Sequence, residues 1–271
     1  MVELIVSKKE DIVRIPTHIV GLDEQMSNGV PAGHLTLICG AAGTMKSSVC
    51  FNILYNETLM NKRTGLYLSL EQSYSSIINH MISMDYDLTK VNLVIIKDLA
   101  TVNEQIEKIN TNANGSLIIL DVACIRKEIK DLQNNENKGW LNVIKNVLKK
   151  IKAQAKLDLF VLDSLSALYV LSKFENPRIE LFFLFEFLRD LNLTSYVITE
   201  AAANSTKYGE YDEDFLSDGI IYINLSSYRR RQVREISVVK MRSTKCNHDI
   251  FSLEFRNGKF YAEYGGKNPL L

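Results

Sequence analysis

The chain lacks an excess of either charge, since 32 basic residues balance 32 acidic ones over 271 positions. A neutral chain has no overall attraction for nucleic acid or an anionic membrane, so any such contact has to come from a local patch. Cysteine is also scarce, and the four cysteines form no C-x-x-C pair and have no neighbouring histidine pair. This spacing predicts core thiols in a reducing cytoplasm rather than disulfides or a metal site, at Cys39, Cys50, Cys124 and Cys246.

Long apolar stretches are missing as well. The first residues, 1–9, hold too short an apolar run for a signal peptide, and no later segment reaches membrane-spanning length without a charge. There is no internal repeat of the kind that indicates a solenoid or a duplicated domain. Because 46% of the residues are apolar, the chain can bury a substantial core. We therefore expect one cytoplasmic domain over residues 1–271, with 1–14 as an N-terminal arm and no membrane partner.

The most informative stretch is residues 35–60. A short apolar run, 35–39, has the length of a strand, a glycine-bearing loop follows it, and Lys46 opens a long helical pattern without Pro or Gly. Such a loop aims backbone N–H groups at one point, where the positive end of the helix adds to the attraction for an anion. Residues 40–47 match the phosphate-loop pattern G-x-x-x-x-G-K-[ST] in all but one place. The match predicts that Lys46 reaches the β- and γ-phosphates and that the Ser47 hydroxyl holds Mg²⁺; a chance turn before a helix is the less favoured alternative.

The exception is Met45, which replaces the glycine before the lysine. Glycine is needed where φ is positive or where the backbone presses on a phosphate. We therefore expect Met45 to have an ordinary helical φ and a side chain directed away from the nucleotide.

Beyond this stretch, apolar runs alternate with helical patterns up to residue 200, after which four strand patterns follow without helices. Runs that are apolar on both faces indicate a mostly parallel sheet covered by helices, and Asn257-Gly258 is a type I′ hairpin signal. The predicted fold class is α/β, a mostly parallel twisted sheet with helices on both faces, closed by a C-terminal antiparallel β-meander. The expected strands are 35–39, 65–70, 91–96, 117–120, 157–162, 195–199, 219–225, 233–241, 250–255 and 259–264, and the expected helices begin at 46 or span 75–84, 104–109, 140–155 and 179–191.

Hydrolysis of a bound nucleotide also needs a carboxylate near Mg²⁺ and a group that activates water. Two strand-end aspartates are candidates for the metal, and Asp163 is preferred because a small hydroxyl residue follows it and its strand leads into a long helical crossover. For Asp121 a helix cap is the simpler interpretation. Glu71 lies at the carboxyl end of the strand that follows the phosphate-loop helix, where a parallel sheet brings it beside the γ-phosphate. The turn-rich stretch 15–33 is expected to form a collar beside the nucleotide.

Several of these segments, in this order, resemble the KaiC family within the RecA-type ATPases. The resemblance covers nearly the whole chain, and it implies a RecA-like fold. The matching segments are Ile15–Thr17, Gly21–Asp23, Gly29–Gly33, the phosphate loop, Tyr67–Gln72, Val161–Leu168, Ile198–Glu200, Leu216–Ile221 and Val238–Arg242.

The resemblance implies an ATPase that binds ATP with Mg²⁺, in which Ser47 and Asp163 support the metal and Glu71 activates water. It also implies that Lys240 and Arg242 act on the nucleotide of a neighbouring subunit, within a homo-oligomer that we expect to be a hexameric ring. The residues implied at the nucleotide are Gly40, Gly43, Thr44, Met45, Lys46, Ser47 and Ser48.

Two departures from the family pattern qualify these implications. In the family two adjacent glutamates follow the second strand, whereas Gln72 takes the second place here, which suggests slow turnover. At the positions where the autophosphorylating relatives carry Ser-Thr, this chain has Asp214-Phe215, so autokinase activity is not expected.

Three functions remain open from the sequence. The favoured one is a regulatory ATPase that acts on an unidentified protein partner. The second is a DNA-binding recombination accessory protein, because Tyr228–Arg231 and Arg234 could meet bases and phosphates, although an exposed turn or a subunit contact suits the neutral chain better. The third is a nucleotide sensor that binds ATP without hydrolysing it, which Met45 and Gln72 would favour.

Overall fold

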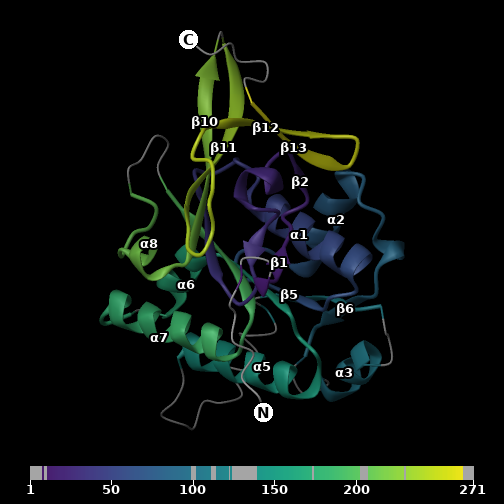
Figure 1. The fold of residues 1–271 in the computed structure, drawn as a ribbon. Helices are drawn as coiled ribbons and strands as arrows, with labels where there is room; N and C mark the ends of the chain where they lie inside the picture. The colour runs from purple at the N-terminus through teal and green to yellow at the C-terminus, as the bar shows by residue number, and fades with distance from the viewer. Residues whose placement is uncertain are drawn as a thin grey trace.

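The computed structural model describes residues 8, 11–98, 102–110, 114–121, 123, 139–172, 174–201, 207–228 and 230–264. Most strands belong to one sheet of eleven, while β1 (Arg14–Ile15) and β3 (Val30–Pro31) form a separate pair. Figure 1 shows the long β10–β11 hairpin projecting at the top of the view. Across the large sheet the order is β2 (Ile19–Val20), β13 (Lys259–Glu263), β12 (Phe251–Arg256), β11 (Arg231–Met241), β10 (Gly219–Tyr228), β4 (Leu35–Gly40), β9 (Thr194–Glu200), β8 (Leu159–Asp163), β5 (Gly65–Ser69), β7 (Leu117–Asp121) and β6 (Leu93–Ile96).

The sheet changes character along its width. From β10 through β4 to β6 all neighbouring strands are parallel, and from β10 to β13 they are antiparallel. Asn257 and Gly258, between β12 and β13, have φ of 52° and 70°, as a type I′ turn requires. The predicted fold class is therefore confirmed, including the closing meander. The parallel pairing of β2 with β13 at the edge was not predicted.

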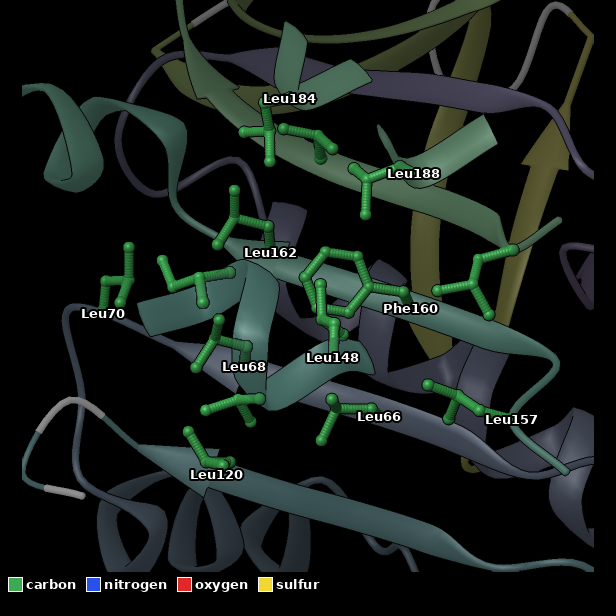
Figure 2. Packing of buried hydrophobic residues seen from close by; sticks show 14 of the residues in the cluster. Leu66, Leu68, Leu70, Leu120, Leu148, Leu157, Phe160, Leu162, Leu184 and Leu188 are labelled. Atoms are coloured by element: carbon green, nitrogen blue, oxygen red, sulfur yellow. The ribbon is translucent and has the colours of Figure 1, made fainter. Parts of the chain in front are cut away.

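Helices cover both faces of the sheet, and each face has its own apolar cluster. One cluster lies under α3, α5, α6 and α7, and the other lies under α1 and α2. Figure 2 shows part of the first, where Leu66 and Leu68 of β5 meet Phe160 and Leu162 of β8. The helices are α1 (Lys46–Asn61), α2 (Tyr74–Ser83), α3 (Val102–Asn110), α5 (Trp140–Gln154), α6 (Leu165–Ser172), α7 (Pro177–Asp190) and α8 (Glu213–Leu216), with short 3-10 turns η2 (Asp23–Met26) and η3 (Leu88–Lys90).

The parallel strands are in register, so that their carboxyl ends meet at one edge of the sheet. Gly40 of β4 pairs with Glu200 of β9, and Ser69 of β5 pairs with Asp163 of β8. In an open α/β sheet this edge is where ligands bind. Side chains from four separate parts of the chain are thereby brought to one place.

Two expectations about individual segments are wrong. The stretch 15–33 packs along the middle and end of α1, where Asn52 donates to the Thr17 carbonyl and His18 contacts Glu57, instead of beside the phosphate loop. Of the predicted core thiols, Cys39 and Cys50 are buried, but Cys246 is partly exposed. Cys124 and residues 1–7 and 9–10 of the predicted arm lie outside the described residues. Within the described part of the chain, every helix is too short or too polar to cross a membrane.

Candidate nucleotide-binding site

The loop between β4 and α1 has the shape that its glycines allow. Gly40 has a φ of 158°, and a Cβ there would lie 2.2 Å from the carbonyl oxygen of Ile223, so no other residue fits without movement of the backbone. Gly43 has a φ of 79°, which also favours glycine. The Thr44 hydroxyl donates to the Ala41 carbonyl across 2.8 Å and closes the loop. The loop therefore ends at the amino terminus of α1, whose unpaired N–H groups attract an anion.

The expectation for Met45 is wrong. Its φ is 73° and its ψ is 25°, so Met45 adopts the left-handed conformation that a glycine would have at this place. Its side chain is half-buried against the apolar cluster beneath α1, and the residue also lines the cavity described below. The local geometry of the loop is thus kept although the glycine is absent.

Lys46 opens α1 and bends back over the loop. Its Nζ donates to the carbonyl oxygens of Gly40 and Ala41, each across 2.8 Å, and the residue is only 9% exposed. Burial lowers the pKa of the Lys46 ammonium, and the carboxylates of Glu200, Asp163 and Glu71 act in the opposite direction. The ammonium is the cation at the centre of a carboxylate-rich site.

Asp163, the last residue of β8, is buried beside the start of α1. Its carboxylate accepts a hydrogen bond of 2.5 Å from the Tyr67 hydroxyl. Burial raises the pKa of Asp163, and the nearby Tyr67 and Ser47 hydroxyls act in the opposite direction. A hydroxyl and a carboxylate are oxygen ligands of the kind that Mg²⁺ takes when it also keeps water and substrate phosphates. No cluster of three or more metal-binding side chains occurs among the described residues. The pair therefore fits Mg²⁺. Asp121, the other candidate, is the last residue of β7, and its side chain lies outside the described part of the structure.

Glu71 follows β5 and faces the same space. The Ser164 hydroxyl donates to its Oε1, which ties the carboxylate to the residue after Asp163. Gln72 is exposed, and its Oε1 accepts a hydrogen bond from the Ser76 hydroxyl across 3.3 Å. The carboxylate and the amide therefore have different partners and are not interchangeable.

A cavity of about 560 Å³ joins these groups. One wall comes from α2, where His80 Nε2 lies 3.0 Å from the Ser48 hydroxyl. The lining includes Tyr67, His80 and Glu200, which have no expected role from the sequence, and Arg234, which the sequence suggested only for DNA binding. The sequence could have assigned Glu200 to the site, because it is the last residue of a strand and Glu71 also follows closely on a strand end. Nothing in the local sequence around Arg234 indicates that it lies at this site.

Arg234 reaches the loop from the meander. Its Nε donates to the Gly43 carbonyl across 3.2 Å, although the two residues are 191 positions apart. This part of β11 therefore lies against the phosphate loop of its own subunit. Of the other members of the arginine cluster, Arg230 and Arg231 are exposed, and Arg229 lies outside the described residues.

Lys240 and Arg242 lie at the other end of β11 and do not line the cavity. The Lys240 ammonium donates to the carbonyls of Asp214, Phe215 and Ser217 at the end of α8. Arg242 forms an ion pair of 3.0 Å with Asp218, and its side chain is 53% exposed. Within one subunit this pair is separate from the phosphate loop.

A glycine-bearing loop at the carboxyl edge of a parallel sheet, with a buried lysine and a strand-end aspartate, defines the phosphate-loop class of nucleotide-binding proteins. Comparison of the sequence with known families narrows this class. The profile of the family described as "ATPase: KaiC" matches residues 15–259, and the chain belongs to that family of ATPases.

Individual relatives agree with this assignment. A protein of Sulfurisphaera tokodaii, described as a UPF0273 protein, is 27% identical over 87% of this chain and 77% of its own length. The circadian clock oscillator protein KaiC of a Nostoc species is 27% identical over 86% of this chain but only 41% of its own length. The chain thus spans about two-fifths of the clock protein.

A solved structure shows the same fold. The KaiC-like protein of the hyperthermophilic archaeon Pyrococcus horikoshii superposes with a TM-score of 0.69 at 20% identity, covering 93% of this chain and all of that one. The RecA-type fold implied by the sequence resemblance is therefore confirmed. The identity is too low for this match to carry more than the fold.

Proposed function

We propose that the protein is a slow, Mg-dependent regulatory ATPase that converts ATP and water to ADP and phosphate. The observation that carries the proposal is the convergence, in one cavity, of the phosphate loop, the Ser47–Asp163 pair and the Glu71 carboxylate. Each of these groups supplies a different requirement of phosphoryl transfer, namely binding, metal support and water activation.

In the proposed mechanism the loop N–H groups and the Lys46 ammonium hold the β- and γ-phosphates. Ser47 and Asp163 would hold Mg²⁺, which would neutralise charge on the phosphate oxygens of the bound nucleotide. Glu71 accepts the proton of the attacking water, and the Ser164 hydroxyl keeps its carboxylate in position. Gln72 cannot share this role because an amide takes no proton, which supports slow turnover.

We propose one domain over the whole chain, and a ring as its working form. One eleven-stranded sheet extends from β2 at one edge to β6 at the other, with an apolar cluster on each face, which supports one domain. The pairing of Gly219 with both Thr36 and Met241 puts the Lys240 end of β11 beside the start of β4, away from the loop that follows Gly40. This separation supports action of Lys240 and Arg242 on a neighbouring subunit, in a cytoplasmic homo-oligomer that we propose is hexameric.

DNA binding is the less supported alternative. Of the arginine cluster that suggested it, Arg234 is engaged by the phosphate loop, and the exposed members lie in a tight hairpin turn. ATP turnover measured with and without single-stranded DNA separates the two functions. Stimulation by DNA would favour the recombination accessory, and equal rates favour the regulatory ATPase.

Substitution of Lys46 by alanine tests nucleotide binding. We expect Lys46→Ala to abolish Mg-ATP binding, because it removes the charge aimed at the phosphates and leaves a residue that suits a helix. Binding would be followed by calorimetry, with Lys156→Ala, an exposed lysine outside the cavity, as the matched control. Unchanged ATP affinity in the Lys46 variant would remove the phosphate-loop assignment.

Substitution of Glu71 by glutamine tests hydrolysis separately. We expect Glu71→Gln to retain ATP binding and to lose turnover by about a hundredfold or more, since the amide keeps the hydrogen bonds but cannot accept a proton. If ATP is bound and hydrolysed by this variant at the wild-type rate, the base is a different residue. If the wild type binds ATP and never hydrolyses it, the protein is the nucleotide sensor.

A further inference from the structure

We propose that Glu200 is the second carboxylate of the hydrolytic site and orients the attacking water in place of the glutamate that Gln72 has replaced. This inference rests on the proposed ATPase function and assigns that site a further catalytic residue. Three observations carry it: the position of the Glu200 backbone, the hydrogen bonds of the neighbouring carboxylates and the order of the strands.

The backbone of Glu200 is fixed close to the phosphate loop. Glu200 is the register partner of Gly40, so the two residues are about 4.8 Å apart across the sheet. The N–H of the next residue, Ala201, donates to the Gly40 carbonyl across 3.2 Å, and this same carbonyl accepts from Lys46 Nζ. The N–H of Glu200 donates to the Ser166 hydroxyl across 3.2 Å, which holds the strand end from its other side.

The three carboxylates of the cavity differ in what they bind. Asp163 accepts a hydrogen bond from Tyr67, and Glu71 accepts one from Ser164. The carboxylate of Glu200 lines the cavity, is exposed to it and accepts no hydrogen bond from any residue that the structure describes. It is also the carboxylate that most strongly favours the charged form of Lys46. Its oxygens are therefore available to a water molecule beside the phosphates.

The strand order leaves room for that water. Strand β8, with Asp163 at its end, lies between β9 and β5, so Glu200 and Glu71 flank the proposed metal position from opposite sides. Strands two places apart are separated by about 9–10 Å, enough for a terminal phosphate and a water between the two carboxylates. Gln72 lies on the same side as Glu71, and its amide carries no charge with which to orient the water.

The chemical step is balanced with these groups. The water oxygen forms a bond to the γ-phosphorus while the bond between that phosphorus and the bridging oxygen of ADP breaks. One water proton passes to Glu71, and the second O–H donates to Glu200, which fixes the direction of the lone pair without accepting the proton. Products are ADP and phosphate, and the proton on Glu71 is later released to solvent.

The test combines turnover with binding. We expect Glu200→Gln to lower kcat by about tenfold or more, because the contact that orients the water contributes to the chemical step. We also expect the variant to bind a non-hydrolysable ATP analogue several-fold more tightly relative to ADP, because a negative charge facing the γ-phosphate has been removed. Glu107→Gln, an exposed carboxylate on α3 outside the cavity, is the matched control.

Rescue identifies the role. Gln72→Glu restores the second glutamate of the family pattern, so the double variant Gln72→Glu with Glu200→Gln should recover most of the turnover lost by Glu200→Gln alone. A Glu200→Gln variant with wild-type kcat, an unchanged preference for the analogue over ADP, or no recovery in the folded double variant would each overturn the inference. These results leave the ATPase proposal intact as long as Lys46→Ala loses binding and Glu71→Gln loses turnover.

Discussion

Met45 is the residue at which this chain departs most from the usual phosphate loop, but its backbone keeps the left-handed conformation that a glycine would have there. A left-handed conformation costs a non-glycine residue about 1–2 kcal/mol. Contact of the Met45 side chain with the cluster beneath α1 offsets part of that cost. The shape of the loop is therefore set by the strand before it and the helix after it, both of which are firmly packed.

This account gives a prediction that separates the backbone from the side chain. Met45→Gly and Met45→Ala both remove the side chain, but only glycine relieves the left-handed strain, so we expect the glycine variant to be more stable than the alanine variant by about 1 kcal/mol. Chemical denaturation of the two variants measures the difference. We further expect Met45→Gly to bind ATP at least as tightly as the wild type.

Either of two results would count against this account of the loop. An alanine variant that is as stable as the glycine variant would mean that no strain is present at position 45. A severe loss of ATP binding in Met45→Gly would mean that the methionine side chain has a positive role.

At the scale of elements, the sequence was sufficient for most strands. Their apolar runs are buried on both faces, and such runs end where the strand ends, so Asp163, Glu71 and Glu200 could be recognised as strand-end residues in advance. Helix α6 was missed because it is apolar on nearly all sides, with Leu165 and Leu168 fully buried, and has no polar face to give a helical period. Strand β2 was missed because two residues are too few for any pattern.

The contact between Arg234 and Gly43 could not have been predicted from local patterns. It depends on the pairing of β10 with β4, which carries β11 alongside the phosphate loop from a distant part of the chain. A helical or strand period says which face a residue occupies, but it does not say which strand will be its neighbour. The same limit applied to the stretch 15–33, whose position along α1 depends on tertiary packing.

The position of Arg234 leads to a prediction for strand β11. We expect Arg234→Ala to weaken ATP binding several-fold, because the guanidinium braces the loop and adds positive charge to the cavity. Arg231→Ala is the control, since Arg231 is an exposed arginine at the turn of the same hairpin. Equal ATP affinities in the two variants would mean that the bond to Gly43 has no part in binding.

At the scale of the whole molecule, Arg234 in β11 and Arg242 directly after it lie toward opposite ends of that strand. Arg234 is at the edge with the phosphate loop, and Arg242 is at the edge where β4 begins. A head-to-tail arrangement of subunits would bring the second edge of one copy against the first edge of the next, and such contacts close into a ring when the rotation permits. Hydrolysis would then depend on assembly.

Action of Arg242 on the nucleotide of a neighbouring subunit can be tested by mixing inactive subunits. Of the two basic residues, Arg242 is the better one to replace, because in Arg242→Ala the Asp218 carboxylate keeps its second ion pair, with Arg189. Lys240→Ala would instead leave three carbonyls at the end of α8 without their hydrogen-bond donor. If Arg242 acts on the neighbouring nucleotide, Arg242→Ala subunits should be inactive alone. Their phosphate loops should become active when the adjoining subunit carries Lys46→Ala, since that subunit still has an intact Arg242.

At equal mixing, about a quarter of the interfaces in a ring pair an intact loop with an intact arginine, so we expect recovery of up to about a quarter of the wild-type rate. Mass measurement with and without ATP establishes that mixed rings have formed, and a mixture of Lys46→Ala with wild type reports any loss due to mixing itself. If Arg242 forms only an ordinary surface ion pair, that pair contributes little to stability, and mixing the two variants gives no recovery of ATP turnover. Inactive mixed rings, or full activity from a stable monomer, would exclude action of Arg242 on the nucleotide of a neighbouring subunit. In both cases the distance between Arg242 and the phosphate loop of its own subunit would play no part in the activity.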